Sequence, residues 1–550
     1  MKHVIFISLF LLASLFSYSQ HTEVKIRPER LHKIDHRIFG HFLERPSWGG
    51  EFGIEDAVIN DDGEIAPDVL KKLKQLEIPV LRFPGGTDVD YTDWTDMIDL
   101  PQRSERPVTM GNQKDEVTNR FGYHEFEKLT TTLDCQAIVP INFFDAYLKR
   151  QPLDSAALHH VGLVAYANAK VGKPLPDGMK NWPAIRKKNG NQEPFEFEYF
   201  QIGNETWALW QWKKQLLEEA NIPDPYEWYI KCVSRYVELI EAVDPEVKII
   251  VDFVDEKMTE MLINTLGNRI DYYVFHSYMP WEMNKNNIEK SGQKTSLSQL
   301  SQEEAWNAMV SIPNSVNEKN MSSIHHPLLK MARNNDLNVA VTEWNWNGWW
   351  SPKSKAPLES FYAHGVGVAG YLHAFIRSAD RIDIACQSML IGSSWGITGI
   401  RVDKDGEKPP YYHPTGQMTS FYGKHHGNFL LKSETTNVPV YGQPLKLAGI
   451  QPKNKVASVD IVATGSDNNV SVFFINRDFS DNRKITVDLS QFESLPSEGK
   501  QFIITGILEN EDANPPEKPY IQQDQKTIRL SGGKCTITLP KRSVSVLKIR

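Results

Sequence analysis

The stretch Phe200–Trp207, with the sequence FQIGNETW, holds the pattern that decides the fold of this 550-residue chain. It begins as a short, mostly apolar run and stops abruptly at an amide followed by the carboxylate of Glu205. A second stretch, Asn338–Asn345, has the same design, with an apolar run that leads to Glu343 and Trp344. Two buried runs that each end in an acid are typical of parallel strands whose carboxyl ends carry a functional site.

Strand and helix patterns alternate around these two stretches, from about Ile34 to Ile400. In one helical pattern Tyr229, Val233, Tyr236 and Ile240 lie on one face, and a β-branched strand follows at 247–252. About eight such strands can be traced, and this alternation is typical of a parallel sheet closed by helices. The sequence therefore predicts a (β/α)8 TIM barrel over residues 34–424.

Both ends of the chain differ from this central region. Beyond about His425 the pattern contains strands only, which predicts a C-terminal β-sandwich over residues 425–550. Near the start, Glu23–Ile26 has strand composition, and we expect residues 20–33 to join the distant sandwich as an N-terminal strand.

The first residues have the design of a secretory signal. A basic start is followed by an apolar run from Val4 to Phe16, and small residues stand at Ser17 and Ser19. The run is too short to span a bilayer, and no later stretch approaches the required length, so no membrane insertion is expected. We predict a signal peptide at residues 1–19, cleaved near Ser19, and a secreted or periplasmic protein.

Composition excludes several classes of function. The chain is 40% hydrophobic and 24% charged, which is ordinary for a globular protein. A net charge of −8 argues against a nucleic-acid partner, because phosphate binding needs concentrated Lys and Arg. The four cysteines are far apart and the histidines lack metal-ligand spacing. Neither a metal nor an organic cofactor is expected.

Glu205 and Glu343 are the candidate catalytic residues. A single acid at a strand end more often makes a salt bridge, but here both acids stand beside amide and Trp residues. Two carboxyl groups at one barrel edge suit glycoside hydrolysis, in which one protonates the leaving oxygen and the other attacks the sugar. Further polar and aromatic residues are predicted at the same edge, where Trp faces can stack on sugar rings: Arg82, Asn142, Asn204, His276, Tyr278 and Trp344.

Motifs spread over some 400 residues strengthen this interpretation. Each is short, but their order and spacing form a specific set: Ile38–Glu44, Leu81–Gly86, Gly122–Phe126, Ile202–Glu205, His276–Tyr278 and Thr342–Asn345. In this set the chain resembles the α-L-arabinofuranosidases of glycoside hydrolase family 51, which have catalytic glutamates after barrel strands 4 and 7.

The resemblance implies a retaining mechanism with Glu205 as acid/base and Glu343 as nucleophile, their carboxyl groups about 5 Å apart. It implies that Arg82 and Tyr278 keep the nucleophile ionised. It places Glu44 and Asn204 against the hydroxyls of the sugar, with Asn142 as a further candidate for the same wall. The other residues predicted to contact the substrate are His276, Thr87 and Trp344.

The chain departs from the family pattern at two places. Thr87 and Asp88 stand where the family usually shows Asn, and Met389 falls where it shows Gln. The shorter hydroxyl of Thr87 predicts a changed hydrogen-bond pattern with the sugar.

The implied activity is removal of α-L-arabinofuranosyl side chains from a plant or algal polysaccharide. The alternatives are the same fold acting on a xyloside, a galactofuranoside or a β-glucan, and a carbohydrate-binding protein without turnover. The expected partner is an oligo- or polysaccharide, and the resemblance also implies that the chain can form a homo-oligomer.

Overall fold

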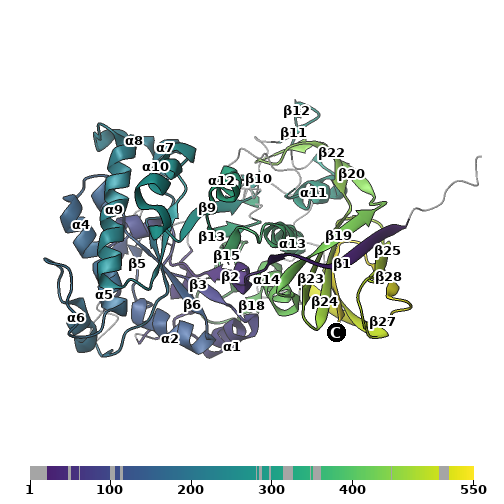
Figure 1. The fold of residues 1–550 in the computed structure, drawn as a ribbon, viewed down its shortest axis with the longest axis horizontal. Coiled ribbons are helices and arrows are strands. Elements are labelled where there is room, and N and C mark those ends of the chain that lie inside the picture. The colour runs from purple at the N-terminus through teal and green to yellow at the C-terminus, as the bar shows by residue number, and fades with distance from the viewer. Residues whose placement is uncertain are drawn as a thin grey trace, which may run out of the picture.

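The computed structural model comprises a barrel of parallel strands and a large antiparallel sheet, with helices between them (Figure 1). It describes residues 21–46, 51–60, 62–98, 106–111, 116–279, 282–283, 288–296, 299–313, 326–346, 349–350, 361–447, 449–506 and 520–550. The predicted signal peptide, residues 1–19, lies outside the described residues.

Eight strands of the described chain close the predicted TIM barrel, and every neighbouring pair is parallel. In chain order they are β2 (Gly40–Phe42), β3 (Val80–Arg82), β6 (Gln136–Ile141), β7 (Tyr199–Ile202), β8 (Lys248–Asp252), β9 (Tyr272–Tyr278), β13 (Val339–Asn345) and β15 (Ile382–Gln387). The order around the barrel follows the chain, so β7 is the fourth strand and β13 the seventh.

Helices surround and extend the barrel. They are α1 (Pro67–Leu76), α2 (Tyr123–Leu133), α3 (Phe144–Tyr147), α4 (Leu153–His160), α5 (Gly162–Asn168), α6 (Trp182–Lys188), α7 (Ala208–Gln211), α8 (Lys214–Glu219), α9 (Pro225–Val243), α10 (Glu256–Leu266), α11 (Gln302–Met309), α12 (Pro327–Asn335), α13 (Phe361–Arg377) and α14 (Pro414–His425).

Helix α9 shows how the sequence specifies these elements. Asp224 caps its start by accepting from the N–H groups of Tyr226 and Glu227, and Pro225 occupies the first turn, where no donor is needed. The predicted stripe Tyr229, Val233, Tyr236 and Ile240 is completely buried. The helix is therefore held by its apolar face against the barrel.

Side chains fill the inside of the barrel. They form one cluster that draws on all eight strands: Phe42, Val80, Ile138, Tyr199, Ile250, Tyr272, Val274, Ala340, Ile384 and Cys386. Because this packing closes the lower barrel, a polar site can form only above it, at the carboxyl ends of the strands.

The C-terminal region forms one continuous nine-stranded sheet. Strand β1 (Thr22–Lys33) lies inside it, antiparallel to β19 (Phe429–Thr436) and parallel to β25 (Arg483–Asp488). The remaining strands are β23 (Val459–Ser466), β24 (Asn469–Asn476), β26 (Glu498–Gly506), β27 (Ile521–Arg529), β28 (Lys534–Leu539) and β29 (Ser543–Ile549). The N-terminal strand thus joins the C-terminal sheet, as expected.

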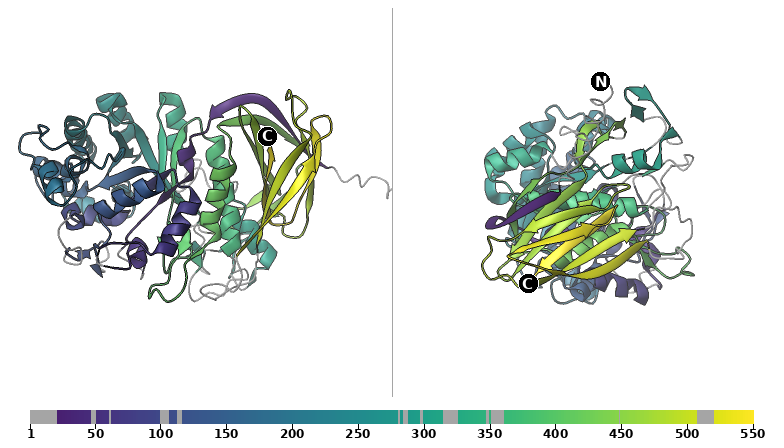
Figure 2. Two further views of the ribbon diagram at one scale, coloured as in Figure 1. Left: turned by 90° about the horizontal axis from the view of Figure 1, so that it is seen from below. Right: turned by 90° about the vertical axis from the view of Figure 1, so that its right-hand side faces the viewer.

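This sheet curves around a core of its own (Figure 2). Val24 of β1, Val472 of β24 and Ile537 of β28 belong to one buried cluster, although β24 and β28 lie far apart in the strand order. The predicted sandwich is therefore a single sheet that folds over itself.

Helices α13 and α14 lie between the barrel and the sheet (Figure 1). Tyr362 of α13 donates to the backbone carbonyls of Ile504 (3.1 Å) and Arg542 (2.7 Å). Also at this junction, Trp306 of α11 donates its indole N–H to the carbonyl of Arg477 at 2.6 Å. These contacts fix the sheet against the barrel.

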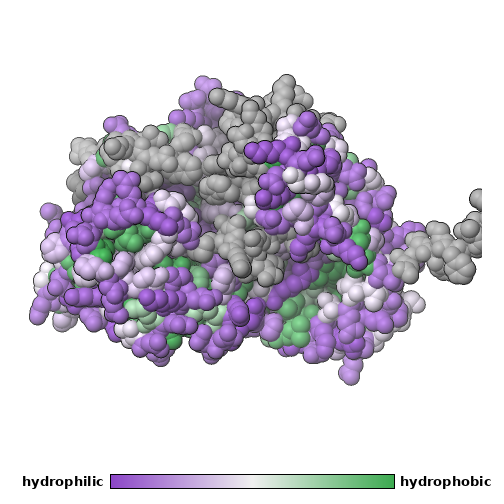
Figure 3. Space-filling view, turned by 90° about the horizontal axis from the view of Figure 1, so that it is seen from above, coloured by the Kyte–Doolittle hydropathy of each residue, from purple (hydrophilic) through white to green (hydrophobic). Residues whose placement is uncertain are grey.

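In the part of the connections that the structure describes there are twelve short strands: β4 (Thr109–Met110), β5 (Glu116–Val117), β10 (Glu282–Met283), β11 (Glu289–Lys290), β12 (Gln293–Lys294), β14 (Trp349–Trp350), β16 (Ile391–Gly392), β17 (Ile400–Arg401), β18 (Tyr411–Tyr412), β20 (Val440–Gln443), β21 (Leu445–Lys446) and β22 (Lys453–Ala457). Among the described residues, no helix is both long and apolar enough to cross a bilayer. The described part of the surface seen from above is mostly hydrophilic, with scattered hydrophobic patches (Figure 3).

Candidate active site

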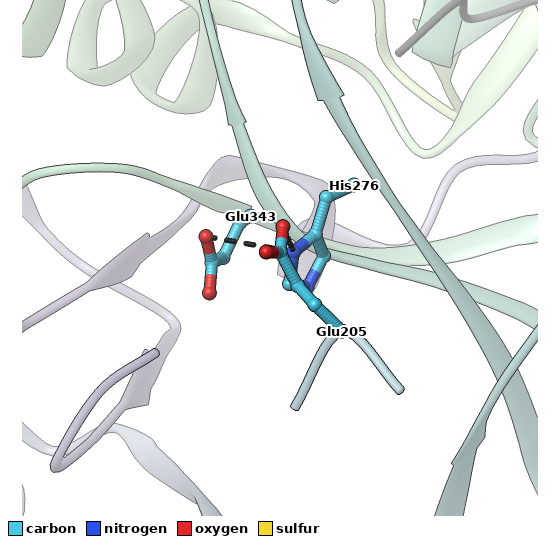
Figure 4. Close-up of side chains that lie close together, drawn as sticks. All are labelled: Glu205, His276 and Glu343. Atoms are coloured by element: carbon cyan, nitrogen blue, oxygen red, sulfur yellow. Dashed lines mark hydrogen bonds and ion pairs between the residues drawn. The ribbon is translucent and has the colours of Figure 1, made fainter. Parts of the chain in front are cut away.

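The two predicted catalytic acids meet at the carboxyl edge of the barrel. Glu205 follows β7, Glu343 lies in β13, and His276 of the intervening strand β9 pairs with Glu343 in the register of the sheet. The carboxylates and the imidazole point toward one another (Figure 4). One carboxylate oxygen of Glu205 lies within 4.8 Å of one carboxylate oxygen of Glu343.

Glu343 is held by donors on both of its oxygens. The guanidinium of Arg82 donates to Oε1 at 2.7 Å, and the hydroxyl of Tyr278 donates to Oε2 at 2.9 Å. Burial and the charge of Glu343 raise the pKa of Tyr278 well above its ordinary value, so the phenol keeps its proton and remains a donor. Both oxygens of Glu343 are thus held by hydrogen bonds, one of them from a charged group.

Arg82 connects Glu343, the candidate nucleophile, with the loop that carries Glu205, the candidate acid. Its guanidinium is completely buried and stands over the ring of Phe42, 4.7 Å from the centroid. Besides Glu343, it donates to Asn204 Oδ1 at 2.7 Å and to Gln201 Oε1 at 3.2 Å. A planar fork with several donors can hold such a set in fixed relative positions.

Glu205 has a different environment. Burial raises the pKa of its carboxyl group, and the positive charges of Lys213 and Arg82 oppose this effect only in part. About a fifth of its side chain remains exposed, so it can reach a molecule bound in the site. A carboxyl group whose pKa is raised retains its proton closer to neutral pH, which a general acid requires.

His276 is neutral and links the two acids. Burial lowers its pKa to about 3. Its Nδ1 lies 2.9 Å from Glu205 Oε1 and 3.5 Å from Glu343 Oε2, and its Nε2 lies 3.0 Å from Thr342 Oγ1. When Glu205 is ionised it can only accept, so Nδ1 must then carry the proton and Nε2 must accept from Thr342.

Glu44 forms another wall of the site, at the end of β2. Its Oε1 accepts from the N–H of Gly86 at 3.3 Å. Burial, together with the charges of Glu343 and Asp88, raises its pKa well above the ordinary value. A Cβ at Gly86 would lie 2.9 Å from Glu44 Oε1 and 3.2 Å from Glu343 Oε1, so glycine keeps the space between these carboxyl groups open.

The other predicted residues divide into two groups. Asn204 is buried beside Arg82, and Thr87 is half-buried directly after Gly86, at the start of the 3-10 helix η3 (Thr87–Tyr91). Asn142 follows the end of β6, and its Oδ1 accepts from the N–H of Asp145 in α3 at 3.1 Å. No described contact joins Asn142 to the carboxylates, and its part in substrate binding stays a prediction.

The prediction that Trp344 contacts the substrate is wrong. We expected it to contact the substrate, but its side chain is completely buried and packs against Tyr371 and Phe375 of α13, with ring centroids 5.4 and 5.0 Å away. Successive residues of a strand point to opposite faces, so the orientation that brings Glu343 into the site turns Trp344 toward the helices.

Met389 stands where the family shows Gln, and the nearest Gln of this chain, Gln387, lies two residues earlier at the end of β15. The side chain of Gln387 accepts from Thr419 at 2.7 Å and donates to the carbonyl of Thr415 at 3.3 Å, both in α14. It therefore joins β15 to a helix. Met389 is buried and provides no hydrogen-bonding group comparable to an amide.

Sequence reasoning missed three polar residues beneath the site: Gln201, Asp90 and Asp252, all buried. Burial raises the pKa of both aspartates, that of Asp252 to about 7. Gln201 and Asp252 interrupt apolar strands, and a polar residue within such a run was the available signal.

Glu205, His276 and Glu343 have side-chain types that can also bind a metal ion. However, both oxygens of Glu343 already accept from Arg82 and Tyr278. A cation there would also face the positive charge of Arg82, so these residues do not fit a metal site.

Two family models match the chain. Residues 72–294 match the model described as α-L-arabinofuranosidase 1 domain, and residues 343–543 match the α-L-arabinofuranosidase C-terminal domain. In structure the chain resembles the GH51 α-L-arabinofuranosidase of Thermotoga petrophila, with a TM-score of 0.70 and 21% identity over 96% of this chain and all of that one. The chain belongs to glycoside hydrolase family 51, the α-L-arabinofuranosidases. It is accordingly a glycoside hydrolase.

Sequence similarity to proteins named α-L-arabinofuranosidase extends over almost the whole chain. A probable α-L-arabinofuranosidase C of Aspergillus clavatus is 24% identical over 548 residues, which are 94% of this chain and 95% of that protein. A protein of the same name from Aspergillus flavus is 32% identical over 212 residues, which are 37% of this chain and 38% of that protein. The match to these proteins and to the family 51 structure thus includes both the barrel and the sheet. Sequence identity is higher, 32%, in the shorter match with the Aspergillus flavus protein.

Proposed function

We propose that the protein is a retaining α-L-arabinofuranosidase in which Glu343 is the nucleophile and Glu205 the acid/base. The observation that carries this proposal is the pair of carboxyl groups within 4.8 Å, in unlike surroundings. In retaining enzymes the two groups are about 5–5.5 Å apart, whereas inverting enzymes separate them further to admit a water molecule.

In the first step Glu343 attacks the anomeric carbon of the sugar while Glu205 gives its proton to the glycosidic oxygen. The carbon–oxygen bond to the leaving group breaks and a covalent glycosyl-enzyme forms. In the second step the ionised Glu205 removes a proton from water, and the water oxygen displaces Glu343 from the same carbon. Two displacements at one carbon leave its configuration unchanged.

The surroundings of each acid support its role. Arg82 and Tyr278 stabilise the negative charge that Glu343 has before attack and after release. Neutral His276 can donate to Glu205 in its ionised state without competing for its proton, because the pKa of His276 lies near 3. The raised pKa of Glu205 lets this acid hold its proton closer to neutral pH, as the mechanism requires of the proton donor.

The choice of sugar rests on the family and on the walls of the site. Both matching models and the cited relatives carry the name α-L-arabinofuranosidase. We assign Glu44 and Asn204 to the sugar hydroxyls, since the side chains of both lie close to Gly86 and to Glu343. Because the pKa of Glu44 is raised, it can donate as well as accept a hydrogen bond.

We further propose that the protein is exported and acts on arabinofuranosyl side chains of plant or algal polysaccharide. The support is the signal-like sequence of residues 1–19. Mass spectrometry of the protein recovered from the periplasm or medium of the native cell should find an N-terminus near Gln20. A cytoplasmic protein that retains Met1 would contradict export.

Glu205→Ala tests the acid/base assignment. Its rate should fall steeply with a natural arabino-oligosaccharide, whose leaving group needs a proton, and much less with a dinitrophenyl α-L-arabinofuranoside. Added azide should restore turnover of the activated substrate and give a glycosyl azide of unchanged anomeric configuration. An equal fall with both substrates would show that Glu205 is not the acid, and NMR detection of an inverted first product would exclude retention.

A further inference from the structure

The loop that carries Glu205 needs an external support. Glu205 has a φ of +50°, in the left-handed region that side chains rarely adopt, and Gly203 shortly before it has a φ of +74°. The residue lies between the end of β7 at Ile202 and the start of α7 at Ala208, outside either element. Its carbonyl accepts from the N–H of Ala208 at 2.9 Å, a bond within this short connection, whereas a general acid must be placed within a fraction of an ångström.

Asp90 holds the backbone on the N-terminal side of Glu205. Its Oδ2 accepts from the N–H of Asn204 at 3.2 Å. Its Oδ1 accepts from the N–H groups of Phe143 and Phe144, at 2.7 and 3.1 Å, just beyond the end of β6. One carboxyl group thus ties the loop after β7 to the loop after β6.

Asp252 holds the C-terminal side. Its Oδ2 accepts from the N–H of Thr206 at 2.7 Å, the residue directly after Glu205. Its Oδ1 accepts from the side-chain amide of Gln201 at 3.2 Å. Gln201 in turn accepts from Arg82, the donor to Glu343, so Asp252 is connected to the surroundings of both catalytic acids.

We propose that Asp90 and Asp252 are positioning residues that fix the backbone on the two sides of Glu205 and so place its carboxyl group for proton transfer. The proposal rests on the proposed role of Glu205 as acid/base. Asp90 is 1% exposed and Asp252 is completely buried, so both act through the loop and neither touches the substrate.

The chemistry of the contacts predicts what the substitution Asp252→Asn would do. Both oxygens of Asp252 accept hydrogen bonds, whereas the amide that replaces its carboxyl group has one acceptor and one donor. If the amide oxygen keeps the N–H of Thr206, the new NH2 group meets the amide of Gln201, which must turn over. The turned Gln201 then presents its own NH2 to Arg82, and donor faces donor.

The experiment compares Asp90→Asn, Asp252→Asn and the control Asp255→Asn. Asp255 also accepts a backbone N–H, that of Met258 at 2.8 Å, and caps α10 three residues after Asp252, but it has no described contact with the loop of Glu205. For each variant kcat/KM is measured with a natural arabino-oligosaccharide and with a dinitrophenyl α-L-arabinofuranoside, and the fall on the first is divided by the fall on the second.

A displaced acid should impair poor leaving groups more, so we expect this ratio to exceed about ten for Asp90→Asn and Asp252→Asn. Loss of folded enzyme lowers both rates equally, so the ratio for Asp255→Asn should stay near one. A ratio near one in both test variants would overturn the proposal. If Asp252→Asn does not fold, Asp90→Asn decides alone.

Glu205→Ala, measured in the same series, separates the two proposals. If its ratio is large while the aspartate variants stay near one, only the positioning role fails. If the ratio of Glu205→Ala is itself near one, the acid assignment fails instead.

Discussion

Two clusters of charge surround buried acids at different places in this molecule, and they are balanced in opposite ways. At the junction of barrel and sheet, Asp460 of β23 binds two arginines, Arg377 of α13 and Arg477, the second at 3.0 Å, with His373 at 3.4 Å. These positive charges hold the pKa of Asp460 well below its ordinary value, against the effect of burial. Here the cations outnumber the acid.

In the active site the acids outnumber the cation. Arg82 stands among Glu44, Glu205 and Glu343 and makes an ion pair with Glu343 at 2.7 Å. The pKa values of Glu44 and Glu205 are raised, since burial and neighbouring charge are not fully compensated. Where cations compensate the acid fully, the cluster stabilises the structure. Where acids are in excess, a carboxyl group can keep a proton that is available for chemistry.

The largest effect should come from Glu343, the proposed nucleophile of the active-site cluster. Glu343→Gln removes the nucleophile, so kcat/KM on any arabinofuranoside should fall at least about a thousandfold, or ~4 kcal/mol in barrier. Glu434→Gln, which changes an exposed acid paired with Arg27, is the control and should leave the rate unchanged. Activity of Glu343→Gln within about tenfold of the parent would remove Glu343 from the mechanism.

Breaking the junction cluster should affect stability and leave catalysis unchanged. Arg477→Met leaves Asp460 with Arg377 and the neutral His373. It should cost about 1.5–3 kcal/mol of unfolding free energy, the range for a hydrogen bond to a charged group, because Arg377 still compensates the carboxylate. Arg269→Met breaks a half-exposed pair with Glu241 and should cost less than about 1 kcal/mol. Urea unfolding measures both, and kcat per folded molecule should match the parent.

The pH dependence of the same variant sharpens this contrast. The pKa of Asp460 is lower in the folded than in the unfolded state, so its ion pairs stabilise the fold above the ordinary Asp pKa of about 3.9. This contribution is lost as the pH falls through the lower, folded-state value. The difference in stability between parent and Arg477→Met should therefore shrink in acid, and a gap independent of pH would show that Asp460 is not its source.

A smaller effect should follow from the departure at Thr87. Thr87→Asn restores an amide beside Gly86 and should raise kcat/KM on nitrophenyl α-L-arabinofuranoside, by up to about tenfold, through one added hydrogen bond to the sugar. Asp88→Asn, one residue further along η3, tests whether the contact depends on that position. An efficient parent that Thr87→Asn slows would show that the hydroxyl of Thr87 already suits the sugar.

The smallest effect concerns the charge near Glu205. Lys213 lowers the pKa of Glu205, so Lys213→Met should raise it and let the acid keep its proton to higher pH. The alkaline limb of the kcat/KM profile should then move upward. Lys214→Met, the exposed neighbour at the start of α8, should leave the limb in place, and a downward movement in Lys213→Met would contradict the electrostatic account.

The sequence by itself determined the elements and the reacting groups. Periodic apolar residues specified helices such as α9, and β-branched runs specified the barrel strands, because helix and strand place side chains at fixed repeats of 3.6 and 2 residues. The sequence also indicated the two acids, Glu205 after β7 and Glu343 in β13, because a carboxylate that directly follows an apolar run can be recognised from neighbouring residues alone.

Only the tertiary structure decided how distant residues face one another. Arg82 and Glu343 are 261 positions apart, and Arg377 and Asp460 are 83 apart. All of β13 is buried, so its apolar pattern does not distinguish the two faces of the strand, and only the placement of Glu343 in the site shows that Trp344 turns to the helices. The positioning role of Asp90 and Asp252 also depends on the closure of the barrel, because only this closure brings their carboxyl oxygens to the backbone around Glu205.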